Sequence, residues 1–133
     1  ISTWHDDQQG ALRGSDTIHI LDDGQCRVAH LGDLGCELSD QQKGQLKNLT
    51  ALMIPVGGFY TIDALQAKAL IDELKPQVVI PMHYRGNGFG YDVIGTLDTF
   101  TQLCSNVIEY PGSQLELTAE TPSQVAVLKP QNV

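Results

Sequence analysis

The sequence predicts an α/β fold, in which helices connect the strands of a mainly parallel sheet. Two continuous apolar runs, "ALMIPV" (51–56) and "QVVIPM" (77–82), are typical of strands buried on both faces. Each run is followed by a segment of helical character, and strands that alternate with helices usually pair in parallel. The 133 residues are enough to bury one core, so we expect a single domain over residues 1–133.

A β-hairpin is expected before the first of these runs. The segment "TIHIL" (17–21) alternates in polarity and is rich in β-branched residues, as in a half-buried strand. Asp23 and Gly24 form a typical tight-turn pair, and "CRVAHL" (26–31) can return as the second strand. The glycine-bracketed stretch "HLGDLG" (30–35) then leaves this strand as a loop.

Helices are expected where polar caps precede periodic segments. Ser39 can cap a short polar helix, and Thr61 can cap a second one whose first turn contains Asp63. Pro76 ends the second helix. The expected helical ranges are 40–49, 62–74 and 94–104.

The C-terminal part reads as short strands joined by turns. The expected ranges are 107–110, 114–118 and 124–128. The last residues, 129–133, are expected to fray because nothing in their sequence would hold them to the domain.

Composition narrows the function classes. The net charge of −8 repels phosphate backbones, so we expect no nucleic-acid partner. No apolar run approaches the roughly 20 residues that span a bilayer, and the polar opening "ISTWHDDQQG" does not resemble a signal peptide, so no membrane partner is expected. The three cysteines form no CxxC pair, which favours free thiols in a reducing, cytoplasmic setting.

Residues suited to chemistry follow the strands of the predicted sheet. Ligands of open α/β sheets bind beyond the carboxyl ends of the strands, where Asp33, the Gly57-Gly58 pair and His83 are expected. His5 lies in the polar segment "STWHDD". Imidazole and carboxylate groups are ligands of zinc, manganese and iron, so these residues form a candidate metal set.

Other readings of the same residues remain open. His19 and His30 lie in expected strands, where a structural role is the default, although His30 is close enough to Asp33 to support it. Gly57 and Gly58 can form a tight turn, or they can present backbone N–H groups to an anion. Nucleotide-binding and serine-hydrolase motifs of the forms GxGxxG, GxxxxGK[ST] and GxSxG are absent in the required contexts.

Four motifs in one order resemble a known family. "STWHD", "HLGDLG", "ALMIPVGGFYTIDALQA" and "PQVVIPMHY" resemble the second half of a metallo-β-lactamase superfamily hydrolase, closest to the UlaG-like Zn-dependent hydrolases of the β-lactamase fold. The resemblance runs from Ile1 to about Tyr84 and extends weakly to Leu117. It implies an αββα sandwich of which this chain is the C-terminal half, a mixed sheet with helices packed on one face.

The resemblance also implies roles for individual residues. His5 would bind the first of two metal ions, His83 the second, and Asp33 would bridge both, with Asp33 and His83 as the catalytic pair. The ions would be zinc, or manganese or iron. The remaining assignments are Tyr84, Gly57 and Gly58 beside a small-molecule substrate, and Asp6 and His30 as supports of the metal ligands.

One family motif, HxHxDH, is absent from this chain. Without it each metal would have two protein ligands, whereas catalytic zinc usually has three, so weak or no metal binding and doubtful activity are expected of this chain alone. The sheet should also expose an apolar face that requires a cover. We expect this cover to be a complementary N-terminal half-domain that carries HxHxDH, or a second copy of the chain in a homodimer.

Three functional hypotheses follow. The first is a metal-dependent hydrolase that needs a complementary half for activity. The second is a non-catalytic, self-associating half-domain, a structural or binding module in which His5, Asp33 and His83 are remnants. The third is a small-molecule module that binds an anion at Gly57-Gly58.

Overall fold

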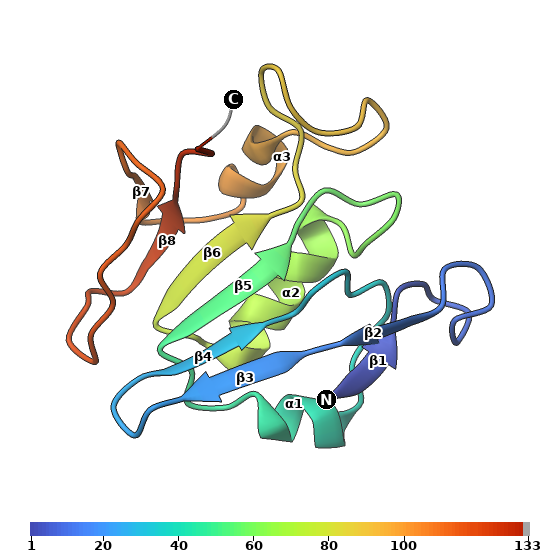
Figure 1. Ribbon diagram of the computed structural model, residues 1–133, viewed down its shortest axis with the longest axis horizontal. Coiled ribbons are helices and arrows are strands. Elements are labelled where there is room, and N and C mark those ends of the chain that lie inside the picture. Colours follow the sequence, from blue (N-terminus) through green and yellow to red (C-terminus); the bar gives the residue numbers. More distant parts are fainter. Residues whose placement is uncertain (132–133) are drawn as a thin grey trace.

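In the computed structural model, which describes residues 1–131, the chain is organised around a six-stranded sheet of order β3-β4-β5-β6-β8-β7 (Figure 1). β3 pairs antiparallel with β4, and every other neighbouring pair is parallel. The α/β class and the mixed sheet are therefore confirmed. The strands of this sheet are β3 (His19–Asp22), β4 (Arg27–His30), β5 (Ala51–Pro55), β6 (Val78–Met82), β7 (Val107–Glu109) and β8 (Gln124–Val127).

The β3–β4 hairpin forms as expected, but the strand before its turn is divided. The Asp23 carboxylate accepts the N–H groups of Gln25 and Cys26 at 2.8 and 2.7 Å, which closes the turn. Upstream, Ile18 is buried between two strands, and its N–H donates to the carbonyl of Ile1 at 2.8 Å. The segment before Ile18 is β2 (Ser15–Thr17), which pairs with β1 (Ser2–Trp4) in a small sheet that the sequence analysis did not anticipate.

The helices are shorter than expected, and one cap was assigned to the wrong residue. Their bounds are α1 (Asp40–Gln45), α2 (Ala64–Leu74) and α3 (Leu97–Thr101). Ser39 caps α1, as expected. Asp63, not Thr61, caps α2: its carboxylate accepts the N–H of Gln66 at 2.9 Å, and the Gln66 side chain accepts the N–H of Asp63. The Thr61 hydroxyl donates to the carbonyl of Ile62 instead.

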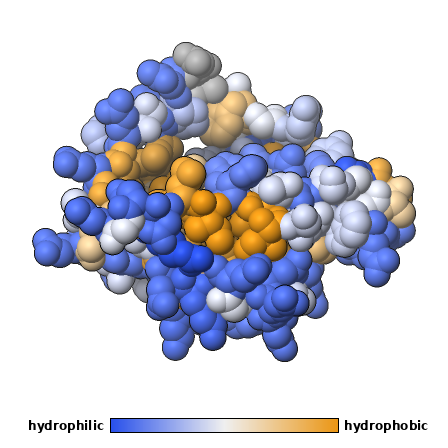
Figure 2. Space-filling model, turned by 60° about the horizontal axis from the view of Figure 1, so that its bottom comes forward, coloured by the Kyte–Doolittle hydropathy of each residue, from blue (hydrophilic) through white to orange (hydrophobic). Residues whose placement is uncertain are grey.

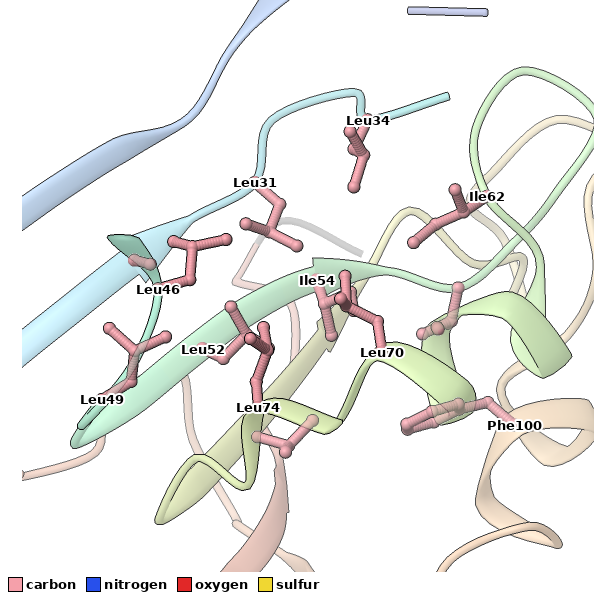
Figure 3. Close-up of a cluster of buried hydrophobic side chains, with 14 of the residues drawn as sticks. Leu31, Leu34, Leu46, Leu49, Leu52, Ile54, Ile62, Leu70, Leu74 and Phe100 are labelled. Atoms are coloured by element: carbon pink, nitrogen blue, oxygen red, sulfur yellow. The ribbon is translucent and has the colours of Figure 1, made fainter. Parts of the chain in front are cut away.

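The main core lies between the six-stranded sheet and α2 (Figure 3). Leu52 and Ile54 of β5 face Leu70 and Leu74 of α2, and Phe100 of α3 is fully buried in the same cluster. Leu31 and Leu34 also enter this core, on either side of Gly32-Asp33. Their burial anchors the loop after β4 while Asp33 itself stays exposed.

The opposite face of the sheet is partly covered by the chain itself. Tyr110, Leu115 and Leu117 pack against a small cluster on the strands that contains Ala51, Val78 and Ala126. The strand expected at 114–118 is therefore wrong: β8 already pairs with β6 and β7, so this segment has no free partner there and crosses the face without regular structure. The large apolar face expected in solvent is reduced accordingly.

Apolar exposure persists at the β3 side of the molecule. The Leu21 side chain of β3 is 73% exposed. The surface seen from the side of β3 and α1 is mostly hydrophilic, with an apolar patch at its centre and further apolar areas around it (Figure 2). Within residues 1–131, no helix has the length and apolar character needed to cross a bilayer. Of residues 129–133, which are expected to fray, Lys129 is held because its N–H donates to the Gly112 carbonyl at 2.9 Å, and residues 132–133 lie outside the described part of the chain.

Candidate functional site

The loops that follow β4, β5 and β6 leave the sheet at one edge (Figure 1). Together with the loop after β1 they line a cavity of about 900 Å³. His5, Asp33 and His83 are all in its wall, so the structure brings together the three residues that the sequence selected as metal ligands. The other lining residues are Gly58, Tyr60, Thr61, Pro81, Met82, Tyr84, Phe89, Gly90, Tyr91, Ile94 and Pro130.

Asp33 and His83 form a close pair in this cavity. The Nδ1 atom of His83 lies 3.3 Å from Oδ1 of Asp33, and the two side chains are 40% and 52% exposed. Burial lowers the pKa of His83 below its usual value, and the charge of Asp33 opposes this effect only in part. The neutral imidazole is therefore favoured near pH 7, and this is the form that can coordinate a metal ion.

The glycines beside His83 have a packing explanation. His83 adopts a left-handed backbone (φ 56°), and its carbonyl lies directly against Gly57, where any Cβ would overlap it. The N–H of Gly58 donates to the carbonyl of Ile62 at 3.2 Å. The N-terminus of α2 is already capped by the Asp63 carboxylate. An anion at Gly57-Gly58 would thus find one N–H already used and a negative charge nearby, which argues against the third hypothesis.

The loop that carries Asp33 is held from two sides. His30 accepts the N–H of Gly32 through Nδ1 at 3.0 Å, which holds the loop next to Asp33. Asp16 of β2 accepts the N–H of Asp33 through Oδ1 at 2.8 Å. Its other oxygen, Oδ2, is buried and has no hydrogen-bond partner among the described residues. The sequence analysis missed Asp16, because a lone aspartate in an alternating segment gives no signal until the β1–β2 pairing is known.

Asp6 supports His5 through the backbone and not through the imidazole. The Asp6 side chain is fully buried, and its carboxylate accepts four backbone N–H groups at 2.7–2.9 Å. Burial raises its pKa, but the four hydrogen bonds outweigh burial and lower the pKa to about 2. The donors are Gln8, Gly10, Leu12 and Arg13.

The loop closed by Asp6 returns to His5. The Gly14 carbonyl accepts the N–H of His5 at 3.0 Å, and Nε of Arg13 donates to the His5 carbonyl at 3.1 Å. Asp6 is thus connected to His5 through the backbone of this loop.

Aromatic side chains make up much of the remaining wall. Tyr84, which the sequence analysis selected, lies with its ring centroid 5.9 Å from that of Phe89, and burial raises the pKa of its phenol. Tyr60 and Tyr91 form a second edge-to-face pair at 5.9 Å. The sequence analysis missed Tyr60, Phe89 and Tyr91, although aromatic residues in glycine-rich loops after buried strands were a usable signal.

The donor atoms fit a metal ion in type and place but fall short in number. Imidazole and carboxylate groups in one cavity are suitable ligands for zinc. Within the described part of the chain, however, no group of three or more His, Cys, Asp or Glu side chains is arranged to hold a metal ion. Asp33 and His83 are the two of these residues whose donor atoms are seen close together, 3.3 Å apart.

A family model described as the "Beta-lactamase superfamily domain" matches residues 1–83, the part of the chain that contains His5, Asp33 and His83. A UPF0173 metal-dependent hydrolase of Staphylothermus marinus is 26% identical over 127 residues, which are 96% of this chain and 47% of that protein. Another of the same description, from Ignicoccus hospitalis, is 42% identical over 65 residues, or 49% of this chain and 28% of that protein.

Two solved structures are also similar. One, from Thermotoga maritima, is described as a candidate Zn-dependent hydrolase of the metallo-β-lactamase superfamily; it superposes with a TM-score of 0.78 at 33% identity over 86% of this chain and 59% of that one. The second is Igni18, described as a metallo hydrolase from Ignicoccus hospitalis, with a TM-score of 0.50 at 30% identity over 73% of this chain and 41% of that one. The chain thus spans 47% of the length of the Staphylothermus relative and 59% of that of the Thermotoga structure.

Proposed function

Because this chain belongs to the metallo-β-lactamase superfamily, we propose that it supplies His5, Asp33 and His83 to the centre of a metal-dependent hydrolase. The observation that carries the proposal is the Asp33–His83 pair, whose donor atoms lie 3.3 Å apart in the wall of a cavity that His5 also lines. Zinc is the metal we propose first, because imidazole and carboxylate ligands suit it and the Thermotoga structure is described as a candidate Zn-dependent hydrolase.

The residues of the chain would have different roles at this centre. Asp33 and His83 would hold the metal. Burial lowers the pKa of His83, so its ring is neutral near pH 7 and can coordinate a metal ion. A bound metal would act as a Lewis acid toward the bond to be hydrolysed. His5 faces the same cavity from a loop whose position Asp6 fixes. Tyr84 would contact the substrate, because it lines the cavity next to His83.

The missing ligands would come from a complementary half that carries the HxHxDH motif, or from a second copy of the chain. Two findings support a requirement for further donors: the absence of a three-residue metal group among the described residues, and the 47% coverage of the Staphylothermus relative. The alternative of a non-catalytic, self-associating half-domain predicts a stable dimer without metal. We further propose a small-molecule substrate and a reducing, cytoplasmic setting, consistent with the three free cysteines.

Zinc binding separates these functions. Equilibrium dialysis of the chain against zinc, followed by metal analysis, measures bound zinc per chain, and sedimentation equilibrium measures the oligomeric state with and without zinc. For a metal centre, His83→Ala should reduce bound zinc at least tenfold. His19→Ala is the matched control, because His19 is an exposed strand histidine outside the cavity.

The outcomes are distinct. Zinc bound by the wild-type chain and by His19→Ala, but not by His83→Ala, supports the proposed centre. A metal-free dimer whose zinc affinity is the same in all three proteins, so that His83 contributes nothing to it, supports the non-catalytic module instead.

A further inference from the structure

We propose that the cavity wall supplied by this chain binds an uncharged aromatic group, and that Tyr60 and Tyr91 select it. The identification of this group as part of a substrate rests on the proposed hydrolase function. The binding itself does not, because the aromatic wall is formed without a metal ion. The inference therefore names the substrate class: esters, amides or lactones whose non-reacting part is uncharged and aromatic.

The wall is built from two edge-to-face aromatic pairs, whose rings are carried by the loops after β5 and β6. Tyr60, in the loop after β5, meets Tyr91, in the loop after β6, at a centroid distance of 5.9 Å and an interplanar angle of 67°. Tyr84 and Phe89 form the second pair at 5.9 Å and 65°. All four rings line the cavity that contains Asp33 and His83. Edge-to-face geometry is also the arrangement that a further aromatic ring would adopt on such a wall.

The loop that presents these rings is held in place before any ligand binds. The N–H of Gly86 donates to the carbonyl of Phe89 at 3.0 Å, and the Phe89 ring packs so closely on Gly86 that a Cβ there would overlap it. The N–H of Arg85 donates to the Gly95 carbonyl at 2.8 Å. A preformed wall binds its ligand without the entropy cost of ordering a loop.

Charge excludes an anionic occupant of this wall. No lysine or arginine is among the described residues that line the cavity, and its formal charge comes from Asp33. Two guanidinium groups contact lining residues. That of Arg13 lies 5.8 Å from the centroid of the Tyr60 ring and donates through Nε to the His5 carbonyl, and that of Arg85 donates through Nε to the Ile94 carbonyl. A phosphate or carboxylate on the distal part of a ligand would face the carboxylate of Asp33 with no lysine or arginine among the lining residues to offset the repulsion.

The exposure of Tyr60 and Tyr91 to solvent gives a driving force for the binding of an aromatic ring. Tyr91 is 73% exposed and Tyr60 37% exposed, so a ring that covers them removes apolar surface of both from water. Tyrosine also binds at low entropic cost, since it has few rotatable bonds to fix.

A matched pair of probes tests the proposal: 2-naphthol, which is uncharged at pH 7, and 2-naphthyl phosphate, which carries the same rings with a negative charge. Both are titrated into the 133-residue chain in the presence of EDTA, with binding followed by NMR shifts of the tyrosine rings. We expect 2-naphthol to bind at least tenfold more tightly than the phosphate. Tyr91→Ala and Tyr60→Ala should each weaken it by about fivefold, the scale of one aromatic contact.

Leu65→Ala is the matched control, because Leu65 is an exposed apolar residue outside the cavity, and it should bind 2-naphthol as the wild type does. Circular dichroism checks that each variant is folded, and Tyr91 is too exposed for its truncation to disturb the core. Equal or tighter binding of the phosphate overturns the proposal, as does 2-naphthol binding that neither tyrosine variant weakens. A chain that binds 2-naphthol but whose zinc affinity is unchanged in His83→Ala refutes the hydrolase proposal alone, and one whose zinc affinity depends on His83 but that prefers the phosphate refutes this inference alone.

Discussion

Two loops of this molecule each place an aspartate close to a histidine, and they treat its carboxylate in opposite ways. In the loop after β1, Asp6 is fully buried, and its two oxygens accept four backbone N–H groups. In the loop after β4, the side chain of Asp33 is 52% exposed, and the structure gives its carboxylate one close neighbour, His83. The oxygens of the Asp6 carboxylate are fully used by backbone hydrogen bonds and cannot bind a ligand, whereas the oxygens of the Asp33 carboxylate remain available.

The difference shows how the two loops are stabilised. The Asp6 loop is closed by its own aspartate, so the side chain is part of the scaffold. The Asp33 loop is closed by other residues, since His30 accepts the Gly32 N–H and Asp16 accepts the Asp33 N–H. A carboxylate can stay free for chemistry when neighbouring side chains satisfy the backbone of its loop.

The largest expected effect is on metal binding. Asp33→Ala should weaken zinc binding at least tenfold in equilibrium dialysis, because it removes a proposed ligand and not merely a support of one. The melting temperature should change by no more than about 2 °C, because the Asp33 side chain is exposed and its loop is held by other residues. A variant that binds zinc like the wild type would remove Asp33 from the proposed centre.

The next effect is on stability, at the point where the two loops meet. The N–H of Gly35 donates to the Trp4 carbonyl at 2.9 Å, and a Cβ at Gly35 would lie 2.6 Å from the Asp6 nitrogen. Gly35→Ala should therefore destabilise the fold by about 1–3 kcal/mol, measured by urea unfolding. Gly44→Ala is the control: it has open space around it in α1 and should stabilise by about 0.5–1 kcal/mol. Equal effects of the two changes would show that the loops are not tightly packed together.

Asp6→Asn should be the next most damaging change. Asparagine keeps one acceptor oxygen, so two of the four N–H groups lose their partner, and the melting temperature at pH 7 should fall by several degrees. The folded pKa of about 2 lies below 3.8, the usual pKa of an aspartate in an unfolded chain. The stabilisation by Asp6 is therefore complete above pH 3.8 and is lost as the pH falls through 2.

Melting curves of the wild type and Asp6→Asn between pH 7 and pH 2 test this window. The difference between the two proteins should shrink over the acid range. A difference that stays constant down to pH 2 would mean that Asp6 acts through packing and not through its charge.

The outline of the fold could be predicted from the sequence because its signals are local. The apolar runs gave β5 and β6, and Asp23-Gly24 gave the β3–β4 turn. The errors arose where two residues compete for one helix cap and where strands pair that carry no apolar pattern. Asp63 displaced Thr61 as the cap of α2 because its carboxylate forms a reciprocal pair with Gln66. The β1–β2 pairing joins residues whose short segments carry no apolar pattern.

The candidate site divides in the same way. Asp33 and His83 follow buried strands, so their shared edge could be inferred from the α/β pattern. His5 was selected largely through the family resemblance. Asp16 could not be selected, since its role depends on a contact with Asp33, 17 positions away. Tyr91 could have been selected from its glycine-rich loop, but its contact with Tyr60, 31 positions away, could not be inferred. These contacts exist only after the loops have been placed by the core.

The smallest expected effect is that of Asp16→Asn, which should raise the melting temperature at pH 7, whereas Asp6→Asn lowers it. Asp16 accepts the Asp33 N–H with one oxygen and buries the other without a partner. Burial raises the pKa of Asp16 above its usual value, and the charge of Asp33 raises it further. The folded state therefore favours the protonated form, so the favourable contribution is present below pH 3.8 and is lost as the pH rises through the folded pKa.

At pH 7 the charge on Asp16 should thus cost stability. Asp16→Asn removes that charge and keeps an oxygen that can accept the Asp33 N–H, so the melting temperature should rise slightly at pH 7 and stay unchanged at pH 3. A fall at pH 7 comparable to that of Asp6→Asn would mean that the second Asp16 oxygen has a partner outside the described contacts. A rise would show that the negative charge has opposite effects in the two loops. Backbone hydrogen bonds stabilise the charge of Asp6, whereas burial and the neighbouring carboxylate of Asp33 destabilise the charge of Asp16.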